Sequence, residues 1–464
     1  MPPTNNALAT TPWQQLKPAL WEALITMLAV LATLGSALLV APGVQTGVLA
    51  VVLSLSLSRS QLDRDVRGRL EAALVLPVVG LAALGVGLLL LRWPWVGAVV
   101  FVAGLFVSIW LRRFGPMAQR AGSLIALPFI TLLTVPHVHA ASGGPLPVWL
   151  VPIVVALLAL LWVSVAHRLT GRLPSITIAE ETPPTTPAPG GGMRPVASTR
   201  MAIQMALALG VSFVVGYLCF AERWSWIVLT AFIVNSGNRG RLDVAYKSVL
   251  RVLGAAGGTV LALSLSVHVG EHAALMSALV LGALFMGMWL RPISYAWWAL
   301  FVTVALALLQ GFAGGSPTAL LWQRLEEIAI GAVIGLLSAW CVLPVRSTDV
   351  LRRRLADALA ALSEALDPQQ ATRTPTRFNE ALAQVALVRP AFRASRWITR
   401  RRGTAHPADW IDVLQACHAP AVALIEQGAT PGRVRQAVGA ARKALREPAT
   451  LLPALQQLNQ TLRE

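Results

Sequence analysis

The chain has 464 residues, of which 56% are hydrophobic and only 13% are charged, and its mean hydropathy is +0.64. Because soluble domains carry about 25% charged residues, this composition excludes a soluble globular protein and indicates an integral membrane protein. The formal net charge of +17 is explained by basic residues in loops on the cytoplasmic side of a membrane, so we do not infer binding to nucleic acid.

Two sets of six apolar stretches predict the membrane-spanning helices, since such a helix needs about 20 mostly apolar residues. The first set covers 20–40, 45–57, 70–91, 95–111, 121–135 and 147–166. The second set covers 201–220, 224–235, 252–269, 273–290, 295–310 and 325–343. We therefore predict an all-α polytopic membrane protein with about twelve transmembrane helices.

A motif that occurs twice indicates that the two sets are repeats. Asp65 precedes Arg69 by four residues and Gly80 by fifteen, and Asp243 precedes Lys247 and Gly258 at the same spacings. Each acidic residue and its basic partner form an i,i+4 pair in the orientation that favours a helix. With six spans each, the repeats are expected to be parallel, with a pseudo-two-fold axis along the membrane normal and a substrate site between the halves.

The distribution of basic residues predicts the topology. Loops on one side carry most of the Lys and Arg residues, whereas the opposite loops carry little beyond Arg92 and Arg223. The positive-inside rule then places both termini in the cytoplasm. The expected regions are a cytoplasmic segment 1–19, repeats 20–170 and 200–345, a cytoplasmic linker 171–199 rich in Pro, Gly and Thr, and a cytoplasmic helical domain 346–464. That last region begins with Leu351, Leu355, Leu359 and Leu362 at helical spacing.

Ionisable residues within a predicted span are costly to bury, so they are candidates for function. Arg324 and Glu327 start the last span and share a helix face at i,i+3, whereas Glu326 points elsewhere. A buried carboxylate, Glu327 or Glu326, would suit proton coupling in an antiporter. The alternative is an interfacial Arg324–Glu327 pair that only orients the helix.

Basic and aromatic residues form the candidate path for an anion. Lys247 and Arg251 lie one helical turn apart where the ninth span enters the membrane, and Arg69 is the counterpart of Lys247. They could attract an organic anion, although positive-inside anchoring also explains them. Tyr295 and Trp298 share a face at i,i+3 and could stack on an aromatic substrate, or belong to the interfacial aromatic belt.

Other chemistry has no motif in the sequence. There is no GxxxxGK[ST] phosphate loop, and HExxH and GxSxG are also missing. The three cysteines, Cys219, Cys341 and Cys417, show no metal-ligand or disulfide spacing. We therefore expect no enzyme activity, no cofactor and no metal. Two Gly-x-x-x-Gly pairs, 254–258 and 331–335, predict close helix packing.

The second half resembles the FUSC family of fusaric acid resistance-like proteins, which belongs with the aromatic acid exporters. The resemblance covers about 200–344. It rests on the order of Trp226-Ile227-Val228-Leu229-Thr230, the basic turn 241–247, Arg251-Val252-Leu253-Gly254, Tyr295, Phe301-Val302-Thr303 and Arg324 to Glu327. It implies a bacterial inner-membrane protein that exports aromatic or other organic acids, with Lys247, Arg251, Arg324 and Glu327 as candidate site residues. The family is similar to plant aluminium-activated malate channels.

Three functions remain open at this point. The first is efflux of small organic acids coupled to protons, the second is a passive organic-anion channel, and the third is a membrane anchor for a basic helical domain. In the third, the arginines at 352–354 and 400–402 would bind lipid headgroups or another acidic partner. Membrane lipids and an organic anion are the expected partners, with an envelope adaptor protein and a second copy of the chain left open.

Overall fold

The computed structural model describes residues 16–59, 66–114, 149–170, 197–220, 224–269, 272–311, 317–370, 373–399, 406–429 and 431–464, with Pro147 and single positions between 118 and 133. Regular structure in these residues is helical. Most of the predicted fifth span, most of the linker, Asp65 and the Arg69 side chain lie outside the described residues. The all-helical membrane fold expected from the composition is confirmed at this level.

The first half of the membrane region consists of five α-helices and one 3₁₀ turn in its described part. They are α1 (Leu16–Val40), α2 (Val44–Arg59), α3 (Val66–Arg92), α4 (Pro94–Trp110), η3 (Leu111–Phe114) and α6 (Val151–Thr170). The second half contains α7 (Ala197–Cys219), α8 (Trp224–Asn235), α9 (Arg241–Val269), α10 (Ala273–Leu290), α11 (Tyr295–Gly311) and α12 (Pro317–Cys341).

Six described helices are long and apolar enough to cross a membrane, and four shorter apolar helices accompany them. The six lie in α1, α3, α4, α6, α7 and α9, and the shorter ones in α2, α8, α10 and α11. Helix α12 is 25 residues long but is not among the six, although its remaining sequence is largely apolar. Its charged residues, Arg324, Glu326 and Glu327, fall within three helical turns of its start.

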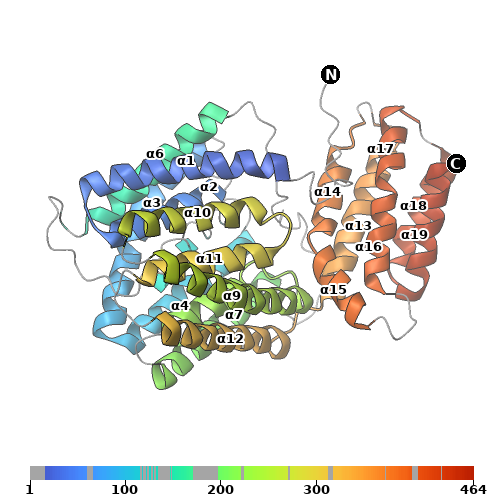
Figure 1. Ribbon diagram of the computed structural model, residues 1–464. Helices are drawn as coiled ribbons and strands as arrows, with labels where there is room; N and C mark the ends of the chain where they lie inside the picture. The colour runs from blue at the N-terminus through green and yellow to red at the C-terminus, as the bar shows by residue number, and fades with distance from the viewer. Residues whose placement is uncertain are drawn as a thin grey trace.

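The helices of the two halves pack in corresponding ways. Helix α6 contacts α1, α2 and α3, and α12 contacts α7, α8 and α9. Between the halves, α1 contacts α10 and α7 contacts α4, so the first helix of each half meets the fourth helix of the other. A duplicated chain is expected to pack in this way, and the internal repeat stays a prediction from the sequence. The long helices run roughly alongside one another in Figure 1.

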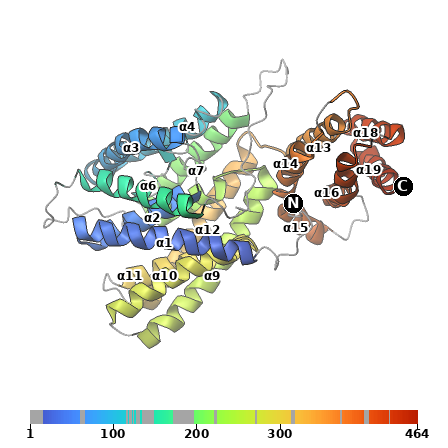
Figure 2. The ribbon, with the colours of Figure 1, turned by 90° about the horizontal axis from the view of Figure 1, so that it is seen from above.

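The C-terminal helices form a separate bundle beside one end of the membrane helices (Figures 1 and 2). This C-terminal bundle comprises α13 (Ser347–Ala365), α14 (Thr376–Ala386), α15 (Arg389–Thr399), α16 (Pro407–Ala416), α17 (His418–Glu426), α18 (Gly432–Ala444) and α19 (Pro448–Arg463). The leucines predicted to share a helix face, Leu351, Leu355, Leu359 and Leu362, are all buried in its core. The sequence pattern did not predict α15 as a separate helix.

Backbone and side-chain hydrogen bonds join the bundle to the membrane helices where α8 ends, α9 begins and α12 ends. We call this region the junction end. The backbone N–H of Arg241 donates to the Val345 carbonyl at 3.1 Å, and that of Leu242 donates to the Ser347 hydroxyl at 2.9 Å. Gln204 of α7 donates to the carbonyl of Val342, which directly follows α12, at 2.8 Å.

Candidate functional site

The most costly groups in the membrane helices are three charged side chains buried in the second half. Arg251 of α9 is 1% exposed, and Arg324 and Glu327 of α12 are 2% and 1% exposed. Arg251 lies between Leu250 and Val252 of α9, and α12 is apolar beyond Glu327, so both helices carry charge into the packed interior. Burying a charge costs several kcal/mol unless it is paired and hydrogen-bonded. The partners of these groups therefore decide what the cluster can do.

The guanidinium of Arg324 lies against an aromatic ring and keeps free donors. It sits 4.0 Å from the centre of the Trp226 ring on α8, within cation–π distance. Its Nη2 donates to the Leu306 carbonyl of α11 at 3.4 Å, which is a long hydrogen bond. Its Nε and Nη1 are buried and have no hydrogen-bond partner among the described residues. Arg324 interacts electrostatically with Glu327, one turn further along α12.

Arg251 forms the second part of the cluster together with Tyr295. The two side chains interact electrostatically, and Arg251 also acts on Arg324. The Nε of Arg251 and the hydroxyl of Tyr295 are both buried without a hydrogen-bond partner in the described part of the chain. The cluster thus brings two cationic groups together with one buried carboxylate, and it retains several unsatisfied N–H donors. A carboxylate or another small oxyanion is the ligand that such donors fit.

The two arginines lie at different depths along the helices. Arg251 is associated with Tyr295, the first residue of α11, whereas Arg324 bonds to Leu306, eleven positions further along α11. At 1.5 Å per residue, these two neighbours are about 16 Å apart along the helix axis. The two side chains nevertheless interact electrostatically. Arg251 is therefore the nearer of the two cations to the junction end, and Arg324 lies further into the helices.

Glycines allow the helices that carry the cluster to approach closely. A Cβ atom added at Gly331 of α12 would lie 2.5 Å from the Ile227 carbonyl oxygen and 2.9 Å from the Thr230 Cβ of α8. A Cβ atom at Gly254 of α9 would lie 2.7 Å from the Ala296 carbonyl oxygen of α11. Both Gly-x-x-x-Gly pairs therefore act in helix packing, as predicted. The contact at Gly331 holds α12 in register with α8, which carries Trp226.

The other predicted residues lie outside the buried cluster. Lys247 forms the predicted ion pair with Asp243 at 2.8 Å and donates to the Ser236 and Gly237 carbonyls at 3.3 and 3.1 Å. It therefore binds the turn between α8 and α9. Glu326 is exposed, on a different face from Glu327.

The two predicted aromatic residues, Tyr295 and Trp298, lie in different surroundings. Tyr295 belongs to the cluster, whereas Trp298 lies beside Arg291, whose guanidinium carbon is 5.9 Å from the ring centre. The contact of Trp226 with Arg324 was not predicted from the sequence, because no spacing rule links a residue of α8 to one of α12.

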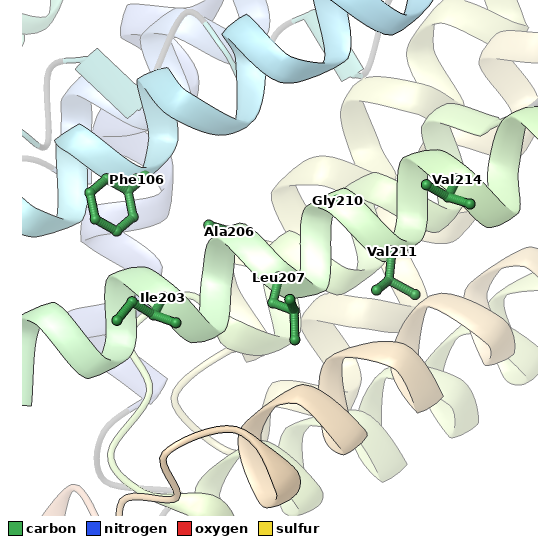
Figure 3. A pocket seen from close by; sticks show the side chains of 7 residues that line it. All are labelled: Phe106, Ile203, Ala206, Leu207, Gly210, Val211 and Val214. Atoms are coloured by element: carbon green, nitrogen blue, oxygen red, sulfur yellow. The ribbon is translucent and has the colours of Figure 1, made fainter.

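An apolar groove lies apart from this cluster. It has a volume of about 490 Å³ and runs between α4 and α7, where the halves meet. Figure 3 shows Phe106 on one side and a row of α7 residues on the other. All seven of its lining residues are apolar or glycine, so their side chains offer no donor to an anion. Among the described residues, no group of three or more His, Cys, Asp or Glu side chains could hold a metal ion.

The fold and this cluster define the class: a helical membrane protein with a buried cationic centre. Residues 205–338 match the family model described as fusaric acid resistance protein-like, which confirms the resemblance found in the sequence. The match includes α8, α9, α10 and α11 and the part of α12 with Arg324 and Glu327. No curated protein and no solved structure matches the chain. The family points to membrane transport.

Proposed function

We propose that the chain transports small organic anions, aromatic acids among them, across the bacterial inner membrane, with both termini in the cytoplasm. The family resemblance supports efflux as the direction of transport. The observation that carries the proposal is the pair of buried arginines, Arg251 and Arg324, with N–H donors left free beside one carboxylate. Such a surplus of buried donors is costly unless a ligand uses them.

The transport site is assigned to the second half of the chain. Asp65 and Asp243 are 178 positions apart in the repeat. At the same offset, the first half has Ala73 in place of Arg251, Leu146 in place of Arg324 and Trp149 in place of Glu327. The first half therefore carries no counterpart of the cationic centre, and it supplies a scaffold that packs against the second half through α1 and α4.

Glu327 is the group that links transport to protons. Glu327 and the substrate carboxylate would both interact with Arg324, so the protonation state of Glu327 is linked to binding of the anion. Proton-coupled efflux needs exchange, in which a proton enters as the anion leaves, whereas a linkage of the opposite sign would move both in the same direction and oppose efflux. The sign of the proton gradient that drives accumulation is therefore a direct test of the role of Glu327.

The test is uptake of radiolabelled p-hydroxybenzoate and of a small dicarboxylate into inside-out vesicles, with proton gradients of either sign and with none. Glu326→Gln is the matched control for Glu327→Gln, because Glu326 is the neighbouring carboxylate and is exposed. We expect gradient-driven accumulation that is lost in Glu327→Gln and kept in Glu326→Gln. Equilibration without accumulation in all three proteins would instead establish a passive anion channel. Vesicles without flux above the empty control would overturn transport.

A second variant tests the binding role of Arg324. A hydrogen bond to a charged group contributes about 1.5–3 kcal/mol, so Arg324→Gln should weaken anion binding by about 10- to 150-fold. Arg324→Lys keeps the charge but loses the planar fork, and it should recover only part of the affinity. Wild-type affinity in Arg324→Gln would remove this residue from the site.

The membrane-anchor alternative finds less support in the C-terminal bundle. Arg352 Nε donates to the Leu445 carbonyl at 2.9 Å, and Arg354 Nη1 donates to the Gln384 carbonyl at 2.6 Å. These two arginines thus serve to join α13 to neighbouring segments of the bundle rather than to bind headgroups.

A further inference from the structure

The apolar groove between α4 and α7 opens towards the outside of the helices, where the two halves of the chain meet. Three of its lining residues, Leu207, Val211 and Val214, are each between 41% and 45% exposed. Figure 3 shows the row of α7 residues that runs from Ile203 to Val214. At 1.5 Å per residue, this row is about 16 Å long. An outward-facing apolar groove in a membrane protein faces the acyl chains of lipids.

One end of this groove lies at the junction end, because α4 and α7 pack antiparallel. The Tyr217 hydroxyl, near the end of α7, donates to the Pro94 carbonyl at the start of α4 at 3.1 Å. Further along, the rings of Phe213 and Phe101 meet edge to face. The same antiparallel register places η3, which follows α4, opposite the first turn of α7, and η3 does pack against α7. Gln204, whose hydrogen bond joins α7 to the junction end, lies in the next turn.

The charged residues of α4, η3 and α7 all lie at that end of the groove. The three elements contain Arg112, Arg113 and Arg200 and no acidic residue. The guanidinium carbon of Arg113 lies 5.2 Å from the centre of the Trp110 ring and 5.0 Å from that of Phe114. A guanidinium held against ring faces keeps its in-plane N–H donors for phosphate oxygens. The groove therefore has an apolar length and a basic end.

Arg200 connects the basic end to the apolar groove. It precedes Ile203, Leu207, Val211 and Val214 at helical spacing, so it lies on the face of α7 that lines the groove. Because a helical side chain points towards the N-terminus of its helix, Arg200 extends from the groove towards the junction end. Its Nε is buried and has no hydrogen-bond partner in the part of the chain that the structure describes.

We propose that this groove binds an anionic phospholipid, with the phosphate at Arg200 and the arginines of η3 and an acyl chain along α7. The junction end is the cytoplasmic end in the proposed topology, and basic pockets between membrane helices on that side suit anionic headgroups. A zwitterionic lipid has the same chains but no net charge to match the basic end. The bound lipid would bridge the two halves, because α4 belongs to the first and α7 to the second. The site is separate from Arg251 and Arg324, so it does not depend on the proposed transport.

Two substitutions test the two parts of the site, each with a matched control. A Cβ added at Gly210 meets nothing within 4 Å, so Gly210→Leu should place its side chain in the groove without a clash with the backbone. Gly282 of α10 has the same open space outside the groove, and Gly282→Leu is its control. Arg200→Gln removes a charge from the basic end, and Arg435→Gln removes the same charge from an exposed position of α18.

Native mass spectrometry of the full chain in detergent, during titration with phosphatidylglycerol or phosphatidylcholine, measures binding of each lipid. We expect the wild type to bind phosphatidylglycerol several-fold more tightly than phosphatidylcholine. Arg200→Gln should remove this preference, because it acts on the headgroup. Gly210→Leu should weaken binding of both lipids several-fold, because it fills the space of the acyl chain. Arg435→Gln and Gly282→Leu should bind both lipids as the wild type does.

Lipid binding that is the same in all five proteins would overturn the proposal, because it would show only the lipid that surrounds any membrane protein. Phosphatidylglycerol with a photoreactive diazirine in its acyl chain locates the site independently. Labelled peptides from α4 and α7 are expected, and labelling confined to other helices would refute the assignment. A dimer that is lost in Gly210→Leu would show that a second copy of the chain fills the groove instead. Thermal melts followed by circular dichroism establish that each variant is folded.

Discussion

The contact of Gly331 with α8 gives the most quantitative test of how the site is held. A methyl group at this position would lie 2.5 Å from the Ile227 carbonyl oxygen and 2.9 Å from the Thr230 Cβ, whereas ordinary contact begins near 3.4 Å. In Gly331→Ala, α8 and α12 must therefore separate by about 0.5–0.9 Å, and overpacking of this kind costs about 1–3 kcal/mol. The higher helix propensity of Ala returns about 1 kcal/mol.

A matched variant removes the propensity effect from this comparison. Gly282 lies in the middle of α10, and an added Cβ there meets nothing within 4 Å. Gly282→Ala should therefore gain the propensity without the clash. Equilibrium unfolding in mixed detergent micelles should show Gly331→Ala less stable than Gly282→Ala by about 1–3 kcal/mol.

The same substitution should also affect the transport site. Movement of α12 away from α8 changes the 4.0 Å contact between Arg324 and Trp226. We expect a several-fold rise in the KM of anion uptake in Gly331→Ala and none in Gly282→Ala. The reasoning is refuted if Gly331→Ala matches Gly282→Ala in both stability and KM.

Two further predictions concern the bundle and the topology. The Nδ1 of His406 accepts the Ala408 N–H at the start of α16, and burial lowers the pKa of His406. The free energy of unfolding that the neutral imidazole contributes is therefore fully present above the ordinary pKa of about 6.5. It should be lost as the pH falls below that value. His406→Asn keeps the cap and should flatten the pH dependence of unfolding, and an unchanged pH slope would contradict this. Cys219 and Cys341 are exposed at opposite ends of the membrane helices, so an impermeant maleimide should label them from opposite sides of the membrane. Labelling of Cys219 and Cys341 from the same side would contradict the topology. Cys417 is buried, and burial raises its pKa to about 12, so this thiol should react only after unfolding.

Sequence patterns predicted well those features that depend on one helix alone. The Asp243–Lys247 ion pair follows from its i,i+4 spacing, and it forms at 2.8 Å. The shared face of Arg324 and Glu327 follows in the same way, and both are buried while Glu326 is exposed. Helical periodicity fixes these relations before any packing occurs.

Features that depend on the register of one helix against another were not accessible from the sequence. The position of Trp226 over Arg324 requires the register of α8 against α12, which the contact at Gly331 sets only in three dimensions. Helix α15 was missed for a different reason. It is 11 residues long, and its exposed Trp397 and Ile398 interrupt the apolar periodicity that marks a buried face.

The hydrogen bonds at the junction end connect the C-terminal bundle directly to the helix that carries Arg251. Arg241 and Leu242 are the first residues of α9, and the backbone N–H groups of both form hydrogen bonds with the segment at the start of α13. Arg251 lies ten residues further along the same helix, so these hydrogen bonds fix the start of the helix that carries the buried cation. A truncation made to test the core should therefore retain Ser347, because removing its hydroxyl releases α9 as well as the bundle.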